Sequence, residues 1–299
     1  MQQDLKKCHY RKNLKKRFFH FGILLCIALV ILTACTLLFA ICTDFSLDTT
    51  LIITFLILIV PFLLYNGVKP LKKDLSKKNF AKSDLINWTL LILFCNQTIS
   101  IFWLLVLEVL PYLIPYFVTM PPLLTISGPT LNTSPFLTIF FSACFIAPII
   151  EEMIFRSILF NKLKMGGLTF AILSSSLLFS LLHLNLKQLP ISIVLGIVLA
   201  LAKHKHSLRL AIYLHGINNF SAFFIGFIFN LFKFSSITPR IILLCILYPS
   251  VSKFYQELKP WIHDLRSTNP LNRQVLKDFF LSPSLLLFFL LSSLIIFFN

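Results

Sequence analysis

Residues 137–160 of the chain are LTIFFSACFIAPIIEEMIFRSILF, an apolar stretch that contains two adjacent glutamates and an arginine. About 20 apolar residues, within a range of roughly 17 to 25, are enough to cross the hydrocarbon core of a membrane. An ionisable side chain placed there costs at least about 2.5 kcal/mol, so it usually has a function. The stretch therefore predicts a membrane span that carries a functional group at Glu151, Glu152 and Arg156.

The rest of the chain has the same apolar character. Hydrophobic residues make up 57% of it and charged residues only 13%, with a mean hydropathy of +0.87, whereas a soluble domain carries roughly 25% charged residues. Further apolar blocks occupy residues 18–42, 51–67, 85–110, 168–186, 190–202, 208–232, 240–254 and 283–298. The blocks predict an all-α fold, a polytopic transmembrane helix bundle of about eight to nine spans that forms a single transmembrane domain over residues 1–299.

The net charge of +16 is concentrated in the segments between these blocks. Seven basic residues lie in residues 1–17 and six in residues 69–82. Every second segment between the blocks has few basic residues. This alternation predicts a basic cytoplasmic N-terminus and a C-terminus outside. It also predicts contact with anionic headgroups of the bilayer. A nucleic-acid partner is not expected. The basic segment 252–282 is predicted to be an interfacial loop, and the proline-rich segment 118–136 an external one.

Spacing within residues 137–160 divides the three charged side chains into a pair and a single group. Glu152 and Arg156 are four residues apart and share one face of a helix, so we expect an ion pair between them. Glu151 points about 100° away and is left for another partner. Two adjacent glutamates in different environments are typical of acid–base chemistry.

Two later apolar blocks carry polar residues at a comparable depth. His183 lies late in the block 168–186, and His215 and Asn219 share a helix face in the block 208–232. Gly216 would let a neighbouring helix approach closely. Counting 1.5 Å per residue from the adjoining loops, we expect Glu151 and both histidines to face one cavity.

Such a set of side chains could hydrolyse a peptide bond without a covalent nucleophile. A carboxylate beside an imidazole can take a proton from water, and a second imidazole with an amide can stabilise the oxyanion. Zinc is an alternative, since Glu151, His183 and His215 with a water form a catalytic zinc set. The chain has no H-E-x-x-H motif, and its seven cysteines include no CxxC pair. Metal-independent chemistry is favoured, because Asn219 suits an oxyanion site better than a zinc shell, and zinc stays possible.

The motifs Glu-Glu-x-x-x-Arg, Phe-x-x-x-His and His-x-x-x-Asn, in this order, resemble the CPBP (Abi) intramembrane protease family, which includes the CAAX prenyl proteases. The similarity covers a catalytic core of about residues 137–232. The resemblance implies that Glu151 and His183 activate the water, and it leaves metal dependence open. It also implies an oxyanion site formed by His215 and Asn219, with Glu152 and Arg156 as supporting residues. Ser157 departs from the family, which commonly has glycine there, and is expected to alter helix packing.

The function implied by this resemblance is that of an intramembrane endopeptidase that cleaves membrane-associated proteins or peptides, in the inner or plasma membrane of a bacterium. The alternative is a non-catalytic membrane scaffold or bacteriocin-immunity factor with the same fold. A proton-coupled transporter is disfavoured, because the sequence shows no pair of related halves.

Overall fold

The computed structural model describes residues 2–41, 71, 74–75, 80–113, 140–186, 188–232 and 238–298. Within these ranges the chain forms helices, turns and short loops without a strand, so the predicted all-α class is confirmed for them. The predicted span 51–67 and the predicted loop 118–136 lie outside the described residues. The α-helices are α1 (Gln2–Ile41), α4 (Lys82–Leu113), α6 (Ala147–Glu152), α7 (Phe160–Leu163), α8 (Leu168–Leu181), α9 (Leu189–Lys205), α10 (Leu208–Phe232), α11 (Thr238–Thr268), α12 (Arg273–Phe280) and α13 (Pro283–Phe298).

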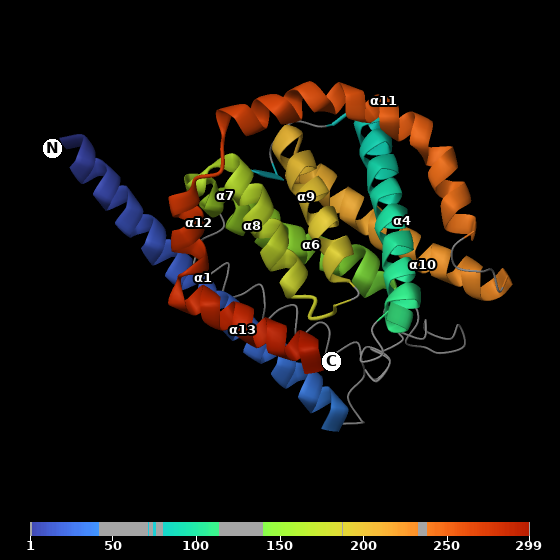
Figure 1. The fold of residues 1–299 in the computed structure, drawn as a ribbon, viewed down its shortest axis with the longest axis horizontal. Helices are drawn as coiled ribbons and strands as arrows, with labels where there is room; N and C mark the ends of the chain where they lie inside the picture. The colour runs from blue at the N-terminus through green and yellow to red at the C-terminus, as the bar shows by residue number, and fades with distance from the viewer. Residues whose placement is uncertain are drawn as a thin grey trace.

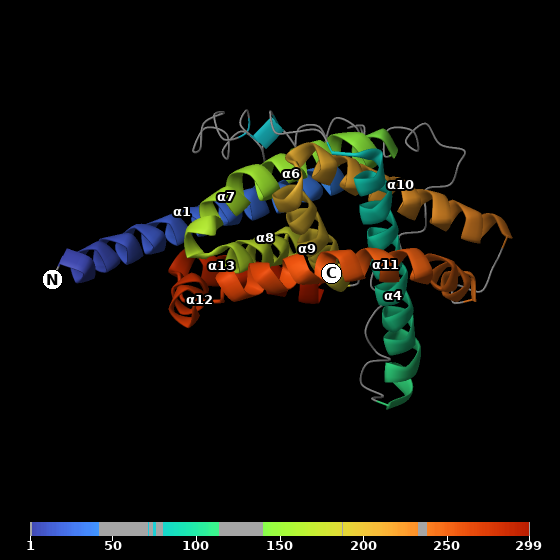
Figure 2. The ribbon, with the colours of Figure 1, turned by 90° about the horizontal axis from the view of Figure 1, so that it is seen from above.

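Helices α8 and α9 lie side by side in the middle of the molecule (Figure 1). On one flank α13 runs along α1, and on the other α11 arcs past the end of α4. Helix α10 packs against α9, α4 and α6. Seen from above, α4 projects well beyond the remaining helices (Figure 2). The short helix α6, which carries both glutamates, is therefore held by α10.

Small residues allow the closest helix pairs to form. A Cβ atom at Gly22 of α1 would collide with Ser284 and the backbone of Leu285 in α13. At Gly196 of α9, a Cβ atom would lie 2.9 Å from the Cβ atom of Ser176 in α8. Small residues at crossing points are typical of helix packing in membranes, where backbones approach closely.

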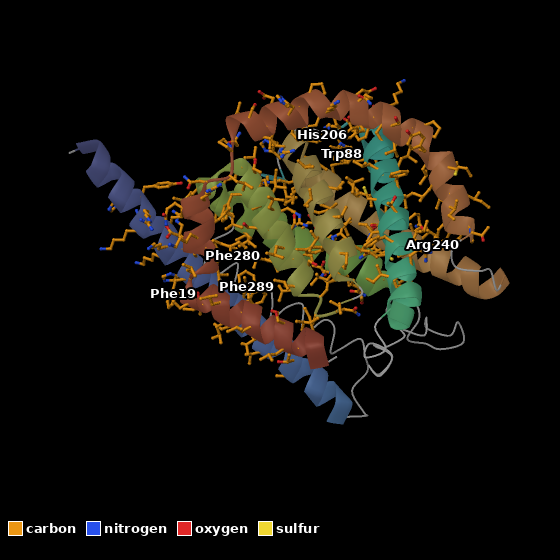
Figure 3. All side chains as sticks on the ribbon, in the orientation of Figure 1. Phe19, Trp88, His206, Arg240, Phe280 and Phe289 are labelled. Carbon is orange, nitrogen blue, oxygen red and sulfur yellow. The ribbon has the colours of Figure 1, made fainter. Side chains whose placement is uncertain are left out.

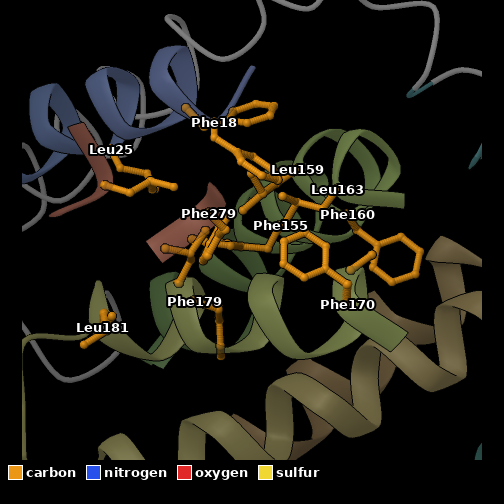
Figure 4. Packing of buried hydrophobic residues seen from close by; sticks show 14 of the residues in the cluster. Phe18, Leu25, Phe155, Leu159, Phe160, Leu163, Phe170, Phe179, Leu181 and Phe279 are labelled. Carbon is orange, nitrogen blue, oxygen red and sulfur yellow. The ribbon is translucent and has the colours of Figure 1, made fainter. Parts of the chain in front are cut away.

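An aromatic cluster ties the N-terminal and C-terminal helices to the central ones (Figure 4). The ring of Phe279 packs edge-on against Phe18 and Phe170, with centroids 5.2 and 5.3 Å apart. Such aromatic pairs add about 0.5–1.5 kcal/mol each beyond the area that they bury. Helices α1, α8 and α12 are thereby joined in one core.

The structure corrects three predicted elements. The block 168–186 ends as a helix at Leu181, and residues 137–160 do not form one regular α-helix over their described part. The segment 252–282 is largely helical rather than a loop, since α11 continues to Thr268 and α12 follows. Its basic residues lie outward, while Phe254, Leu258 and Leu265 recur on the buried side, as in an amphipathic helix.

Few of the described helices are both long and apolar enough to be membrane spans. Among the described helices, the stretch Lys82–Phe102 is long and apolar enough to cross a membrane by itself. The pair Arg273–Phe280 and Pro283–Ile296, bent by 66°, would add a second if it is one broken span. Helix α8 is apolar but has 14 residues, about 21 Å at 1.5 Å per residue. The count of eight to nine spans stays a prediction.

A group that we call the anchor cluster consists of the buried residues Asp74, Ser157 and Lys203 and the partly buried Asn161. The Asp74 carboxylate accepts hydrogen bonds from Ser157 Oγ at 2.9 Å and Asn161 Nδ2 at 2.7 Å. Lys203 Nζ lies 3.2 Å from Asp74 and donates to Asn161 Oδ1 at 2.9 Å. Burial raises the pKa of Asp74, but the Lys203 ammonium and these hydrogen bonds outweigh it and hold that pKa below its ordinary value. Ser157, the departure from the family, thus contributes a buried contact.

Candidate active site

The two glutamates lie between two π-helical turns. Ser142–Ile146 and Met153–Leu159 are π-helical, and α6 fills the gap between them. π-helical turns are rare and occur often at functional sites. The irregular backbone therefore marks the same segment that the charged side chains mark.

Proline explains part of this irregularity. The N–H of Ala147 donates to Ser142 O, five residues back. In that register Ala143 O should next accept from residue 148, which is a proline without an N–H. Asn219 of α10 donates its Nδ2 hydrogen to Ala143 O instead, at 2.8 Å. The carbonyl left without a partner by Pro148 is thus satisfied by a residue that the sequence places in the site.

Glu152, Arg156 and His215 form the buried part of the site. The predicted ion pair is present, with Arg156 Nε 3.3 Å from Glu152 Oε2, and both side chains are fully buried. Glu152 also contacts His215, which spacing did not predict: His215 Nδ1 lies 3.0 Å from Glu152 Oε1. Since a carboxylate beside a guanidinium is an acceptor, Nδ1 carries the hydrogen and donates it. Glu152 therefore fixes the orientation of the imidazole.

Glu151 faces the other nitrogen of the same ring. His215 Nε2 is 3.7 Å from Glu151 Oε2, and the Glu151 side chain is 24% exposed whereas His215 is 2% exposed. This distance exceeds a direct hydrogen bond but allows both groups to contact one water molecule. The two adjacent glutamates thus have different environments, one buried and paired and the other open.

Phe179 connects the two halves of the site. Its ring centroid lies 4.8 Å from the Arg156 guanidinium carbon, 4.8 Å from the His183 ring and 5.7 Å from the His215 ring. Phe179 is 1% exposed, and its position in the core is labelled in Figure 4. The sequence contains this phenylalanine in a motif, but only the fold brings both histidines to its ring.

His183 lies in a turn just after α8, not inside a helix as predicted. Its Nδ1 is 3.0 Å from Phe179 O, so Nδ1 carries the hydrogen and Nε2 remains an acceptor. The next residue, Leu184, has a positive φ of 49°. Among the described residues, no polar contact joins His183 to Glu151 or His215.

Asn219 belongs to a line of amides across the site. Asn218 Nδ2 donates to Asn219 Oδ1 at 3.1 Å, and Asn96 of α4 donates in turn to Asn218 Oδ1. Neither Asn96 nor Asn218 was expected from the sequence to have a role. Gly216 permits this packing, since a Cβ atom there would lie 2.8 Å from Cys144 O, as expected for a glycine at a close helix contact.

A metal site would require Glu151, His183 and His215 to converge. The parts of the chain that the structure describes contain no group of three His, Cys, Asp or Glu side chains arranged to hold a metal ion. The Nδ1 atoms of His183 and His215 are already hydrogen-bonded, to Phe179 O and Glu152, so their Nε2 atoms are the ring nitrogens available to a metal. Because Glu151 and these two nitrogens do not converge among the described residues, the arrangement does not fit a three-residue zinc site.

Comparison with known proteins identifies the segment that carries the site. Residues 133–221 match the family model described as Type II CAAX prenyl endopeptidase Rce1-like. Among curated proteins and among solved structures, nothing matches the chain. The matched segment includes all three motifs and all six predicted site residues. The resemblance to this family that the order of the motifs indicates is therefore confirmed for residues 133–221.

Proposed function

We propose that the chain is an intramembrane endopeptidase in which Glu151 activates a water molecule that attacks a peptide bond. The observation that carries the proposal is the imidazole of His215 between two glutamates, of which only Glu151 is partly exposed. A buried, paired carboxylate orients the ring, while an open one is available to a reactant. The match to a protease family supports the same reaction class.

In the proposed mechanism, Glu151 takes a proton from water and the hydroxide attacks the carbonyl carbon. His183 Nε2, an acceptor in this arrangement, helps to hold the water. The carbonyl π electrons move to oxygen, and the oxyanion accepts hydrogen bonds from protonated His215 Nε2 and from Asn219. When the C–N bond breaks, Glu151 returns its proton to the amine nitrogen. No covalent intermediate is required.

Asn219 has two tasks in this proposal. One Nδ2 hydrogen goes to Ala143 O, and the second remains for the oxyanion. Glu152 and Arg156 support the reaction without touching the substrate, because Glu152 holds His215 and Arg156 compensates the buried charge of Glu152. We propose that the reaction needs no metal.

The proposed membrane topology has the N-terminus in the cytoplasm and basic segments on that side. Contacts between these predicted cytoplasmic segments support a common side. Tyr10 donates to Met165 O, Arg11 pairs with Asp278, Asp74 pairs with Lys203, and His206 Nδ1 is 3.5 Å from Asp84. We place the chain in the inner or plasma membrane of a bacterium, with membrane-associated proteins or peptides, CAAX-type among them, as substrates.

The test is a proteomic comparison of membranes that carry the native chain, Glu151→Gln, or Glu257→Gln. Glu257 is an exposed glutamate on α11 and serves as the matched control. We expect new C-terminal or juxtamembrane fragments with the native chain and the control, and none with Glu151→Gln. Identical fragment sets, at equal protein levels, would refute the hydrolase and favour the non-catalytic scaffold or immunity factor.

A further inference from the structure

A cationic pocket lies away from the glutamates, between the N-terminal half of α1 and the corner where α12 meets α13. Its volume is about 510 Å³, and its lining includes Arg11, Lys15, Lys16 and Phe19 from α1, with Lys277 and Leu281 from the corner. Figure 3 labels Phe19 on α1 and Phe280 on α12, the two elements that face each other here. The pocket belongs to segments that the proposed topology places at the cytoplasmic boundary.

Positive charge dominates the pocket. Four cationic side chains accompany a single carboxylate, Asp278. Arg11 binds Asp278 through two hydrogen bonds of 2.8 and 3.0 Å, and Lys15 lies 3.6 Å from it. Lys16 and Lys277 are exposed and, among the described residues, have no ion-pair partner. The pocket therefore keeps excess positive charge that an anion would neutralise.

Two apolar stripes begin at the pocket and run away from it. On α1, Phe19, Ile23 and Ile27 are exposed at four-residue spacing. On α13, Leu287, Leu290 and Leu294 are exposed and share a helix face with Pro283, which also lines the pocket. Helices α1 and α13 lie side by side along this length (Figure 1). A ligand with an anionic head and long apolar chains would match both features at once.

We propose that this pocket binds the phosphate of an anionic phospholipid, with the acyl chains lying along the exposed stripes of α1 and α13. Lys16 and Lys277 contact the phosphate, while the Arg11–Asp278 pair holds α1 against α12. The inference rests on the proposed membrane insertion and is independent of the hydrolase.

Native mass spectrometry of the full chain in neutral detergent can test the site. The probes are phosphatidylglycerol, phosphatidylcholine and inorganic phosphate, with Lys16→Gln/Lys277→Gln as the variant. A control, Lys253→Gln/Lys259→Gln, removes two exposed charges of α11 outside the pocket. Each lysine near an anionic surface contributes about 1 kcal/mol, so the pocket variant should bind phosphatidylglycerol roughly 30-fold more weakly. The control should change less than about threefold.

The native chain should bind phosphatidylglycerol more tightly than phosphatidylcholine, and inorganic phosphate should not displace the lipid. Lys16→Arg/Lys277→Arg should retain binding, which separates lost charge from lost folding, and Glu151→Gln should bind as the native chain does. Equal binding of both lipids, equal loss in both Gln double variants, or displacement by phosphate alone would overturn the proposal.

Discussion

The anchor cluster and the Glu152–Arg156 pair are both buried ion pairs, but they differ in how their polar atoms are satisfied. Asp74 accepts hydrogen bonds from Ser157 and Asn161 besides its contact with Lys203. By contrast, Glu152 Oε2 and all three nitrogens of Arg156 are buried without a hydrogen-bond partner, although the ion-pair distance is 3.3 Å. Of the two described pairs, Glu152–Arg156 is the one with side-chain atoms buried without a hydrogen-bond partner.

The difference separates an element of stability from an element of function. A buried polar network stabilises a fold only when its members are satisfied, and incomplete satisfaction is costly. Proteins tend to accept such costs at functional sites. Glu152 also holds His215 beside the partly exposed Glu151, whereas the described hydrogen bonds of the anchor cluster join its own members. We therefore expect changes at the site to lower activity and changes in the anchor cluster to lower stability.

The largest effect should follow Glu151→Gln. Removing a general base lowers the rate about 10²- to 10⁴-fold, while the partly exposed side chain leaves no buried charge behind. Cleavage of a membrane substrate and the midpoint of thermal unfolding would be measured together. If the variant lost its fold along with its activity, Glu151 would have a role in stability, and it would not differ from Asp74 in this respect.

Asp74→Asn should act on stability instead. Removing one partner of a buried pair costs about 3–5 kcal/mol, because Lys203 is left with an uncompensated charge. Ser157→Gly should cost less, about 1.5–3 kcal/mol for one lost hydrogen bond to a charged acceptor, because Asn161 and Lys203 still contact Asp74. Chemical unfolding in detergent measures both. Activity per folded molecule should stay within about twofold of the native value, and a selective loss of catalysis would contradict the assignment.

Gly216→Ala should affect both properties. The added Cβ atom would lie 2.8 Å from the backbone oxygen of Cys144, so α10 must move away from the π-helical turn. Overpacking of this kind costs about 1–3 kcal/mol. Gly196→Ala is the matched control, since its Cβ atom would meet the side chain of Ser176 away from the site. We expect similar destabilisation from both variants and reduced turnover from Gly216→Ala alone.

The smallest expected effect is a loss of folding stability at acidic pH. The folded-state pKa of Asp74 is depressed, so its contribution to stability is fully present above the ordinary carboxyl pKa of about 4. It is lost as the pH falls through the lower folded-state value. The native chain should therefore lose stability in this range, and Asp74→Asn should lose less. If the free energy of unfolding of the two proteins fell equally with pH, the Asp74 carboxylate would not be the cause of the acid sensitivity.

Much of the site could be predicted because its signals are local. The i, i+4 spacing of Glu152 and Arg156 predicts their ion pair, and the divergent direction of Glu151 predicts a separate environment. The contact between Glu152 and His215 joins residues 63 positions apart, so no local spacing in the sequence could predict it. The π-helical turns were also missed, because hydropathy reports burial but not hydrogen-bond register.

The helices also differ in how well the sequence predicted them. Block 208–232 coincides with α10, which contains no proline, whereas block 137–160 is divided by Pro148 and by changes of helical register. Helix α11 extends through the basic segment because its apolar residues follow a helical period that a span-length window averages away. Periodicity would have found this helix.

Isotope incorporation tests whether Glu151 activates water for peptide hydrolysis. Membranes with the native chain, incubated in H₂¹⁸O, should yield fragments whose new C-terminal carboxyl carries ¹⁸O, detected by mass spectrometry. Membranes with Glu151→Gln at equal abundance should yield no such fragments. The same ¹⁸O-labelled fragments from the variant would contradict the account.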